Sequence, residues 1–534
     1  MSKIQKNFLS GALILTIANA LVNLIGALYK IPLANLIDTT GMNYYNDGYQ
    51  IYALMFVLST AGVPVAISKM VSEAVAKDRA NEPRKILKNG LLIFGLIGLL
   101  LTSLMIVLMR PLSGLLQNGN TVNYCIAMIA PSIFFVCVSA VIKGYFQGYK
   151  CMTPTAWFQV IEAAFKLFGI VIILVLIQKG YGDNYMVLAC GGTLGVTCGS
   201  FIATLFMVTR LLLEKDIGRH VPEALPSRTN RQITRTIISL AIPISLSSTV
   251  MSITSTLDMF LVKYSLRQYG LDVAGVKDVY GAYTGATSSL FNLPPSITIT
   301  VGIAVLPFLT TAFAKNNQAE AFRNMRSASK VVSLFAMPCA MGMSVMSEPI
   351  IKLLYTKSYW EVAIPALRLL AISIFFVSFV SLTGVFLQSV GRVKITLATM
   401  AIGAVMKLSV NLLMVQKIGI MGAPMGTFAC YGSIFVLNTM IIRRKMNFKM
   451  PYRLIFIKPF VCSALCCGAA YGSWKGLCLL LGESKLWLIV ALLLAVAVYA
   501  VSVLALRVLE KEDMVLIPKG EKIGALLERK GWLR

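Results

Sequence analysis

Long apolar runs divide the chain, and they constrain its fold more than any other feature. Each run is near or above the roughly 20 residues that a helix needs to cross the hydrocarbon core of a bilayer. Fourteen such runs are found, at 8–36, 49–76, 89–109, 122–142, 155–178, 185–209, 236–262, 279–314, 331–354, 362–389, 395–416, 420–442, 455–481 and 486–506. The sequence therefore predicts an all-α polytopic membrane protein with about 14 transmembrane helices.

Composition supports this class. The 534 residues are 57% hydrophobic and 13% charged, whereas soluble domains average about 25% charged residues. Only short connections and a basic tail separate or follow the runs, so we expect no catalytic domain and no enzyme. Lys3 and Lys6 precede a first run that is too long for the apolar region of a cleaved signal peptide, which predicts an uncleaved first span.

Metal and histidine chemistry find little support in the sequence. The eleven cysteines form no CxxC pair, and Cys462, Cys466 and Cys467 suit small packing residues better than ligands. The only histidine, His220, lies in a basic loop next to Arg219. We therefore expect no cofactor and no metal.

Lysine and arginine gather in alternate connections, which predicts the orientation. With a cytoplasmic N-terminus, the connections 77–89, 214–232, 315–327 and 443–453 lie inside, whereas 37–48 and 178–185 lie outside. Lys143 and Lys150 are assigned to an inner connection. Both termini are then cytoplasmic. The net charge of +27 is mainly a signal of topology, and we expect no nucleic-acid partner.

Charged side chains inside the runs are the candidates for a binding site. A lysine at membrane depth costs roughly 2.5 to 3.5 kcal/mol, so it normally faces a bundle interior or a wet cavity. Lys30 is the leading candidate because Pro32 follows it within the first run. The full set of cavity candidates is Lys30, Lys69, Glu73, Glu162, Lys166, Asn292, Arg368 and Lys407.

Several of these residues also have a structural interpretation. Glu162 and Lys166 are four apart and could neutralise each other. Lys69 lies on one helix face with Glu73 near the cytoplasmic end, where a lysine can extend to the interface. Lys30 and Arg368 could reach the outer interface in the same way. Lys407 has no carboxylate three or four residues away, which favours a role in a cavity.

Prolines within the runs predict bent helices. Proline removes a backbone donor, and the freed carbonyl is tolerated only against protein or water. Pro32 and Pro64 interrupt the first two runs, and Pro294 and Pro295 follow Asn292 in the long run 279–314. We predict that these four prolines bend helices lining the cavity.

The chain also repeats itself. Residues 147–167 align with 388–408, which matches Gln147 with Gln388 and Lys166 with Lys407. This predicts an N-terminal six-helix lobe at 1–215, a cytoplasmic linker at 216–232, a C-terminal six-helix lobe at 233–445, and two extra helices with a basic tail at 446–534. Lobes of six spans keep the same orientation, and the substrate would lie between them.

Three segments carry a resemblance to a known family. They are GALYKIPLANLI, YQIYALMFVLSTAGVPVAISKMVSEAVAKDR and GYFQGYKCMTPTA. The chain resembles the stage V sporulation protein B family of polysaccharide-biosynthesis membrane proteins. That family is a branch of the MOP flippase superfamily, which includes lipid II flippases of the MurJ type. Members of the MurJ branch often carry a basic residue on the eighth span, and this chain has none there before Lys315.

The resemblance implies two six-helix lobes that open alternately to either side, a cationic cavity, and two C-terminal helices that form a groove facing lipid. It implies a monomeric flippase of the bacterial cytoplasmic membrane that carries an undecaprenyl-pyrophosphate-linked cell-wall precursor, lipid II or a related oligosaccharide, in peptidoglycan biosynthesis, cell shape or sporulation. A coupling ion or the membrane potential would drive it. An ion-coupled multidrug exporter of the same fold is the alternative. An enzyme acting on polyprenyl lipids is disfavoured, because the inner loops lack clustered acidic or histidine motifs.

Overall fold

The computed structural model describes residues 3–77, 79, 81–115, 121–213, 228–482 and 484–508, and this part of the chain is helical without any strand. The all-α prediction is confirmed. His220, Arg219, most of the predicted linker and the tail beyond Val508 lie outside the described residues.

Contacts divide the chain into two compact units. The first unit comprises Met1–Lys263 with Asp272–Gly281, and the second comprises Tyr264–Leu271 with Ala282–Arg534. The segment from Ile233 to Lys263, which the sequence assigned to the second lobe, groups with the first unit. The six-helix repeat stays a prediction.

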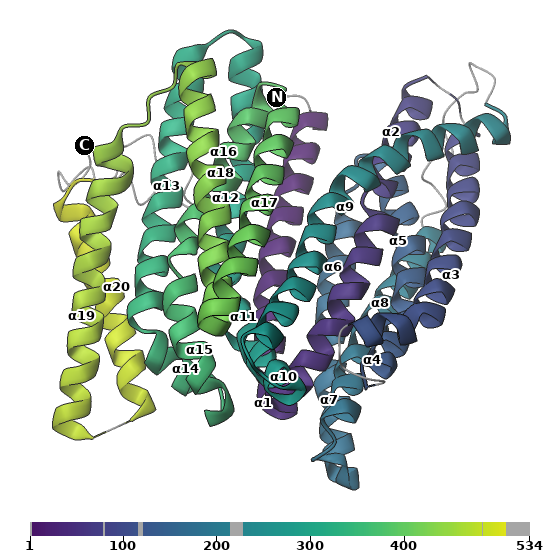
Figure 1. Cartoon of the computed structure of the whole chain (residues 1–534). Helices are drawn as coiled ribbons and strands as arrows, with labels where there is room; N and C mark the ends of the chain where they lie inside the picture. The colour runs from purple at the N-terminus through teal and green to yellow at the C-terminus, as the bar shows by residue number, and fades with distance from the viewer. Residues whose placement is uncertain are drawn as a thin grey trace. The chain divides into compact units, whose positions relative to one another are not determined.

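The helices of the first unit are drawn in purple, blue and teal in Figure 1. They are α1 (Lys3–Thr60), α2 (Val63–Ala76), α3 (Glu82–Leu115), α4 (Thr121–Ile129), α5 (Pro131–Gly148), α6 (Thr153–Lys166), α7 (Phe168–Leu176), the π-turn η1 (Ile177–Tyr181), α8 (Tyr185–Leu213), and most of α9 (Asn230–Gln268) and α10 (Val273–Ala282).

The second unit continues in green and yellow in Figure 1. It contains η2 (Tyr283–Thr287), α11 (Ser288–Phe291), α12 (Leu293–Ala314), α13 (Gln318–Val345), α14 (Ser347–Leu354), α15 (Lys357–Leu370), α16 (Ser373–Ser389), α17 (Val393–Ile418), η3 (Gly419–Met421), α18 (Gly422–Met446), η4 (Arg453–Ile457), α19 (Lys458–Leu481) and α20 (Lys485–Ala505).

Helix α1 folds back on itself at Asp38. This residue has φ 56° and ψ −175°, a conformation that ends regular helix, and its carboxylate accepts a hydrogen bond of 2.8 Å from the Thr39 amide. A straight helix would separate Tyr29 and Tyr45 by about 24 Å, yet their ring centroids lie 6.4 Å apart. Figure 1 shows the two purple limbs that meet at this turn.

The turn at Asp38 bears on two sequence predictions. The segment 37–48, predicted to lie outside, is helical except at Asp38 itself, and its side of the membrane stays a prediction. Pro32 lies within the first limb of α1 and is exposed, and the chain turns six residues later. The carboxylate of Asp38 bonds to its own following amide, which favours a non-helical conformation.

The second apolar run is also broken. The chain leaves the helix at Ala61 and Gly62, and Pro64 lies in the first turn of α2, where a missing amide hydrogen is tolerated. The Gly62 amide donates to the Ser245 hydroxyl at 3.1 Å. A Cβ atom on Gly62 would lie 2.2 Å from the carbonyl oxygen of Ala241, so α9 packs directly on the break.

The long run predicted as one bent span is a single candidate membrane span, Val273–Ala314, in which α10, η2, α11 and α12 follow one another. Pro294 and Pro295 are buried in the first turn of α12. Asn292, two residues before Pro294, is exposed. The prolines therefore begin a helix, which is the position that best accommodates them.

Membrane-spanning character is clear in both units. Among the described residues, ten helical segments are long and apolar enough to span a membrane, and the pair α15 and α16, bent by 46°, makes eleven. The sequence predicted fourteen. Two segments, Leu21–Ala76 with 56 residues and Val393–Met446 with 54 residues, each cover two predicted runs. The predicted run 236–262 lies on α9, which is not among the ten.

An aromatic and aliphatic core holds the second unit together. Phe379 and Phe386 on α16 pack with Val305 and Leu309 on α12 and with Met325 on α13. The last two helices attach to α13, where the Tyr499 hydroxyl donates to the Leu334 carbonyl at 2.6 Å. Large apolar side chains on α20 remain exposed, as expected for helices that face lipid.

A buried ion pair joins α1 to α9 in the first unit. The Lys263 ammonium lies 2.5 Å from a carboxylate oxygen of Asp47, and both side chains are buried. The same ammonium lies 4.8 Å from the centroid of the Tyr280 ring. Removing one partner of a buried pair leaves a charge uncompensated in a medium that cannot solvate it.

We therefore expect Asp47→Asn or Lys263→Met to destabilise the protein by about 3–5 kcal/mol. The double variant should lose less, because neither charge is left unpaired. The midpoint of thermal unfolding in detergent measures both effects. The exposed pair Glu348 and Lys352 is the control, and its single variants should change stability by less than about 1 kcal/mol. A double variant as unstable as the sum of the singles would contradict this account.

Candidate functional site

Lys166, the last residue of α6, is surrounded by tyrosines of α1. Its ammonium lies 4.8 Å from the ring centroid of Tyr49 and 5.2 Å from that of Tyr29. A cation over an aromatic face gains roughly 0.5 to 2 kcal/mol, more where water is excluded. Tyr45 and Glu162 also interact electrostatically with this ammonium. The predicted candidate Lys166 is thus held by rings as well as by a carboxylate.

The tyrosines come from both limbs of α1. Tyr45, Tyr49, Tyr52 and Phe56 follow one another at helical spacing, and neighbouring ring centroids lie 5.6 to 5.9 Å apart. Tyr29 belongs to the limb before Asp38, and its hydroxyl donates to the Gly192 carbonyl of α8 at 3.0 Å. The turn in α1 is what brings Tyr29 to the other rings.

Two further lysines belong to the same site. Lys30 interacts electrostatically with Lys166 as a like charge. Lys143 on α5 lies 4.1 Å above the Phe158 ring and interacts with Glu162. Glu162 also accepts a hydrogen bond of 3.0 Å from Ser200. We call this set the lysine–tyrosine cluster; it consists of Tyr29, Lys30, Tyr45, Tyr49, Lys143, Glu162 and Lys166.

The lysine–tyrosine cluster has more positive than negative formal charges. Three lysines and one glutamate have formal charges that sum to +2, in a unit whose helices are apolar enough to span a membrane. The Tyr45 hydroxyl is buried beside Tyr29 and Lys166. The arrangement can therefore receive an anionic group.

Glycines of α8 hold α6 in place. A Cβ atom on Gly199 would lie 2.6 Å from the carbonyl oxygen of Glu162, and one on Gly195 would lie 2.8 Å from that of Lys166. Only glycine permits such close approach of two helix backbones. In the second unit, a Cβ atom on Gly426 of α18 would lie 1.8 Å from the side-chain oxygen of Asn411 and 3.2 Å from the carbonyl oxygen of Lys407, so α18 packs closely on α17 there.

The other candidates of the first unit lie elsewhere. Glu73 pairs with Lys77 and with Arg228, each at 2.7 Å. Lys69, which the sequence placed on one face with Glu73, is exposed. Lys69 and Lys77 both lie four residues from Glu73. Glu73 pairs with Lys77, because Lys77 lies at the end of the helix, where side chains are freer to meet.

Three candidates lie on different helices of the second unit. Asn292 is exposed at the junction of α11 and α12. Arg368 is exposed in the last turn of α15, and its Nε donates to the Ser347 hydroxyl at 3.4 Å. Lys407 is half-buried on α17. Their part in binding stays a prediction.

Sequence reasoning missed four members of the cluster. Lys143 was assigned to an inner connection, but it lies within α5, which continues to Gly148. The apolar run ends just before Lys143, so hydropathy predicted a connection there although the helix continues. The spacing of Tyr45, Tyr49, Tyr52 and Phe56 would have indicated an aromatic face. Nothing local pointed to Tyr29, which depends on the turn at Asp38.

Metal ligation finds no support in the part of the chain that the structure describes. There, no group of three or more histidine, cysteine, aspartate or glutamate side chains could hold a metal ion.

Fold and site together define a polytopic α-helical membrane protein with a cationic cluster lined by tyrosines. A family model described as "Polysaccharide biosynthesis protein" matches residues 8–313, and a MatE model matches residues 243–413. The first match covers more than half of the chain. The chain therefore belongs to the polysaccharide biosynthesis protein family.

Curated relatives span nearly the whole chain. Stage V sporulation protein B of Bacillus subtilis (strain 168) is 22% identical over 525 residues, which cover 96% of this chain and 98% of the relative. Lipid II flippase MurJ of the same organism is 23% identical over 460 residues, which cover 83% of this chain and 84% of the relative. The chain is thus homologous to both proteins.

Solved structures share the fold. A lipid II flippase MurJ in an inward closed conformation matches with a TM-score of 0.71 and 17% identity, over 92% of this chain and 98% of that one. An inward-facing MATE family transporter of the MOP superfamily matches with a TM-score of 0.65 and 16% identity, over 82% and 99% of the two chains. The predicted MOP fold is confirmed.

The close backbone contact at Gly199 gives a test of the site's scaffold. Gly199→Ala should push α6 away from α8 and destabilise the protein by about 1–3 kcal/mol, because a well-packed contact cannot take an extra methyl group. Gly95 on α3 has no neighbour within 4 Å of an added Cβ atom. Gly95→Ala should therefore be neutral or stabilising, by up to about 1 kcal/mol. Thermal unfolding compares the two, and equal midpoints would contradict the predicted contact.

Proposed function

We propose that this protein is a flippase that moves an undecaprenyl-pyrophosphate-linked cell-wall precursor, lipid II or a related lipid-linked oligosaccharide, across the bacterial cytoplasmic membrane. Movement would occur by alternating access. The observation that carries the proposal is the lysine–tyrosine cluster, with its formal charge of +2.

The chemistry of a pyrophosphate suits this cluster. Its oxygens carry about two negative charges and accept hydrogen bonds from ammonium groups, so they match the net charge of the cluster. A charge crossing a low-dielectric core needs fixed charges of opposite sign around it. The tyrosine rings hold Lys166 in position without neutralising it, which leaves its charge for the substrate.

Homology also supports the flippase function. The relatives named above include a protein called a lipid II flippase and a sporulation protein, and both align over most of this chain. An ion-coupled multidrug exporter is the second candidate, because the MatE model matches residues 243–413 and MATE transporters share the fold. A site for cationic drugs would not, however, be expected to contain three lysines against one carboxylate.

Orientation and symmetry complete the proposal. Both termini would be cytoplasmic, as the distribution of lysine and arginine indicates. Lys166 and Lys407 would be equivalent positions of two homologous lobes, as the alignment of residues 147–167 with 388–408 indicates. The carrier would act as a monomer driven by a coupling ion or by the membrane potential.

The proposal makes a prediction about charge at Lys30. Because charge rather than hydrogen-bond shape matters to a pyrophosphate, Lys30→Arg should keep much of the activity. Lys30→Ala should lose most of it, and Lys30→Glu should be worst because it places negative charge against the phosphates. A cation exporter should respond in the opposite order.

The measurement is complementation of a strain depleted of its lipid II flippase, alongside resistance to cationic dyes, with membrane abundance checked for each variant. Lys179→Glu is the control, since Lys179 is an exposed lysine of the same unit outside the cluster. Full complementation by Lys30→Glu would remove Lys30 from the site. Dye resistance without complementation by the parent protein would favour the exporter.

A further inference from the structure

A pocket lies in the second unit where α18 ends and the chain enters η4. Helix α18 ends at Met446, and Asn447 takes a left-handed conformation with φ 53°. The chain then crosses 448–452 before η4 begins at Arg453. The pocket has a volume of about 200 Å³ and is lined by Thr439, Ile442, Arg443, Phe448, Lys449, Met450 and Tyr452.

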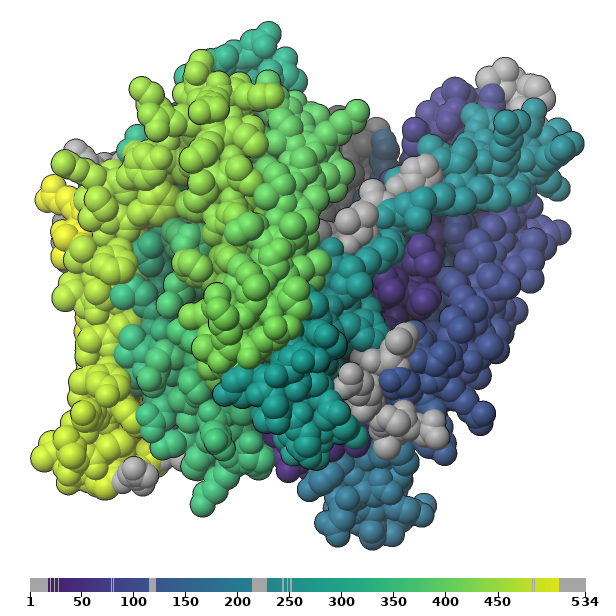
Figure 2. Space-filling model, in the orientation of Figure 1, coloured from purple at the N-terminus to yellow at the C-terminus, as the bar shows by residue number. Residues whose placement is uncertain are grey.

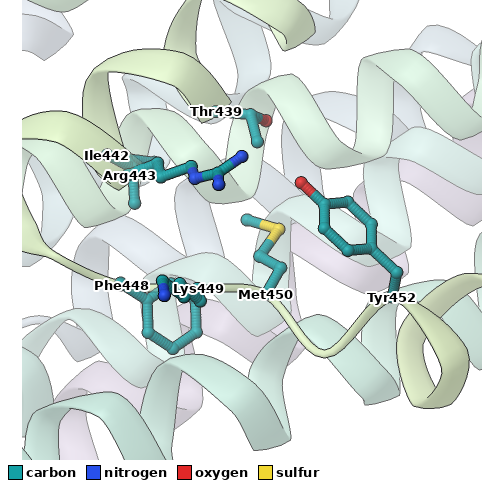
Figure 3. A pocket seen from close by; sticks show the side chains of 7 residues that line it. All are labelled: Thr439, Ile442, Arg443, Phe448, Lys449, Met450 and Tyr452. Atoms are coloured by element: carbon teal, nitrogen blue, oxygen red, sulfur yellow. The ribbon is translucent and has the colours of Figure 1, made fainter.

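Two polar groups face each other across this pocket. Figure 3 shows the Arg443 guanidinium and the Tyr452 hydroxyl pointing toward each other. Both side chains are exposed, so a ligand can reach them. Within the part of the chain that the structure describes, Arg443 has no ion-pair partner. A bound acceptor would satisfy both donors.

The walls of the pocket are apolar and fixed by packing. Ile442, Phe448 and Met450 belong to the main hydrophobic core of the second unit. The Phe448 ring lies 5.4 Å from that of Phe322 on α13. The Tyr452 ring lies 5.8 Å from that of Phe456, which extends the same aromatic core. The donors therefore lie next to well-packed core residues. Ile442, Phe448 and Met450 form an apolar side of the pocket that alkyl groups can contact.

Charge and membrane depth indicate the ligand. Residues 443–458 contain six lysines or arginines and no aspartate or glutamate. Two candidate spans, Val393–Met446 and Arg453–Leu481, end and begin on either side of the pocket. The pocket is thus at the level of lipid headgroups, where basic pockets between helices bind anionic lipids. Figure 2 shows the green and yellow second unit, whose surface this end of α18 helps to form.

We propose that this pocket binds the phosphodiester of an anionic glycerophospholipid of the bilayer. Arg443 supplies the charge, and the hydroxyl of Tyr452 donates to a phosphate oxygen. The glycerol and the first acyl carbons lie against Ile442, Phe448 and Met450. A bound lipid then braces the connection between α18 and α19, where the two additional helices begin.

The test uses the purified full-length protein in a neutral detergent, without any lipid-linked substrate, so that its outcome is independent of the proposed function. Phosphatidylglycerol is added, and bound lipid is counted by native mass spectrometry while the unfolding midpoint is followed. We expect the protein to retain one phosphatidylglycerol more tightly than phosphatidylcholine, and to gain several degrees in its unfolding midpoint.

Arg443→Gln should weaken this binding at least tenfold, and Tyr452→Phe should weaken it severalfold without removing any charge. Arg444→Gln is the matched control: it removes the same charge from the adjacent position, which is exposed like Arg443 but does not line the pocket. Equal losses for Arg443→Gln and Arg444→Gln would overturn the proposal in favour of diffuse attraction. Equal binding of phosphatidylcholine, or displacement of phosphatidylglycerol by millimolar inorganic phosphate, would also overturn it.

Discussion

The cost of a bare ammonium inside a bilayer is the constraint on which the first unit depends. Lys166 meets that cost through two tyrosine rings at 4.8 and 5.2 Å and through Glu162 one turn away. The rings are in place only because α1 reverses at Asp38, and α6 is in place only because Gly195 and Gly199 let it touch α8. The position of the Lys166 ammonium therefore depends on the turn at Asp38 and on the glycines of α8.

The first unit contains buried lysines of two kinds: one that a carboxylate neutralises, and a group with more lysines than carboxylates. Asp47 neutralises Lys263 at 2.5 Å, and that pair serves the packing of α1 against α9. In the lysine–tyrosine cluster, lysines outnumber carboxylates three to one, so a formal charge of +2 remains for a ligand. An excess of like charge is unfavourable for folding, and such an excess is typical of functional sites.

Sequence alone predicted much of the fold because hydrophobic length is a strong local signal. The apolar runs located nearly every long helix, and Lys30, Glu162 and Lys166 were among the charges that the structure brings together. The turn at Asp38 was missed because a residue with φ 56° leaves no mark in hydropathy. Lys143 was missed because a charged residue at the end of an apolar run predicts the start of a loop, although α5 continues past it. Tyr29 required long-range geometry, which no window of sequence contains.

Direct binding of the lipid-linked substrate is the measurement that tests the central claim. Purified protein is mixed with lipid II, and complexes are counted by native mass spectrometry for the parent protein, Lys166→Gln and the exposed-site variant Lys179→Gln. The account predicts that the parent and Lys179→Gln bind lipid II, and that Lys166→Gln binds it at least tenfold more weakly while still unfolding cooperatively. Undiminished binding by a folded Lys166→Gln variant, or no binding by the parent, would contradict the account.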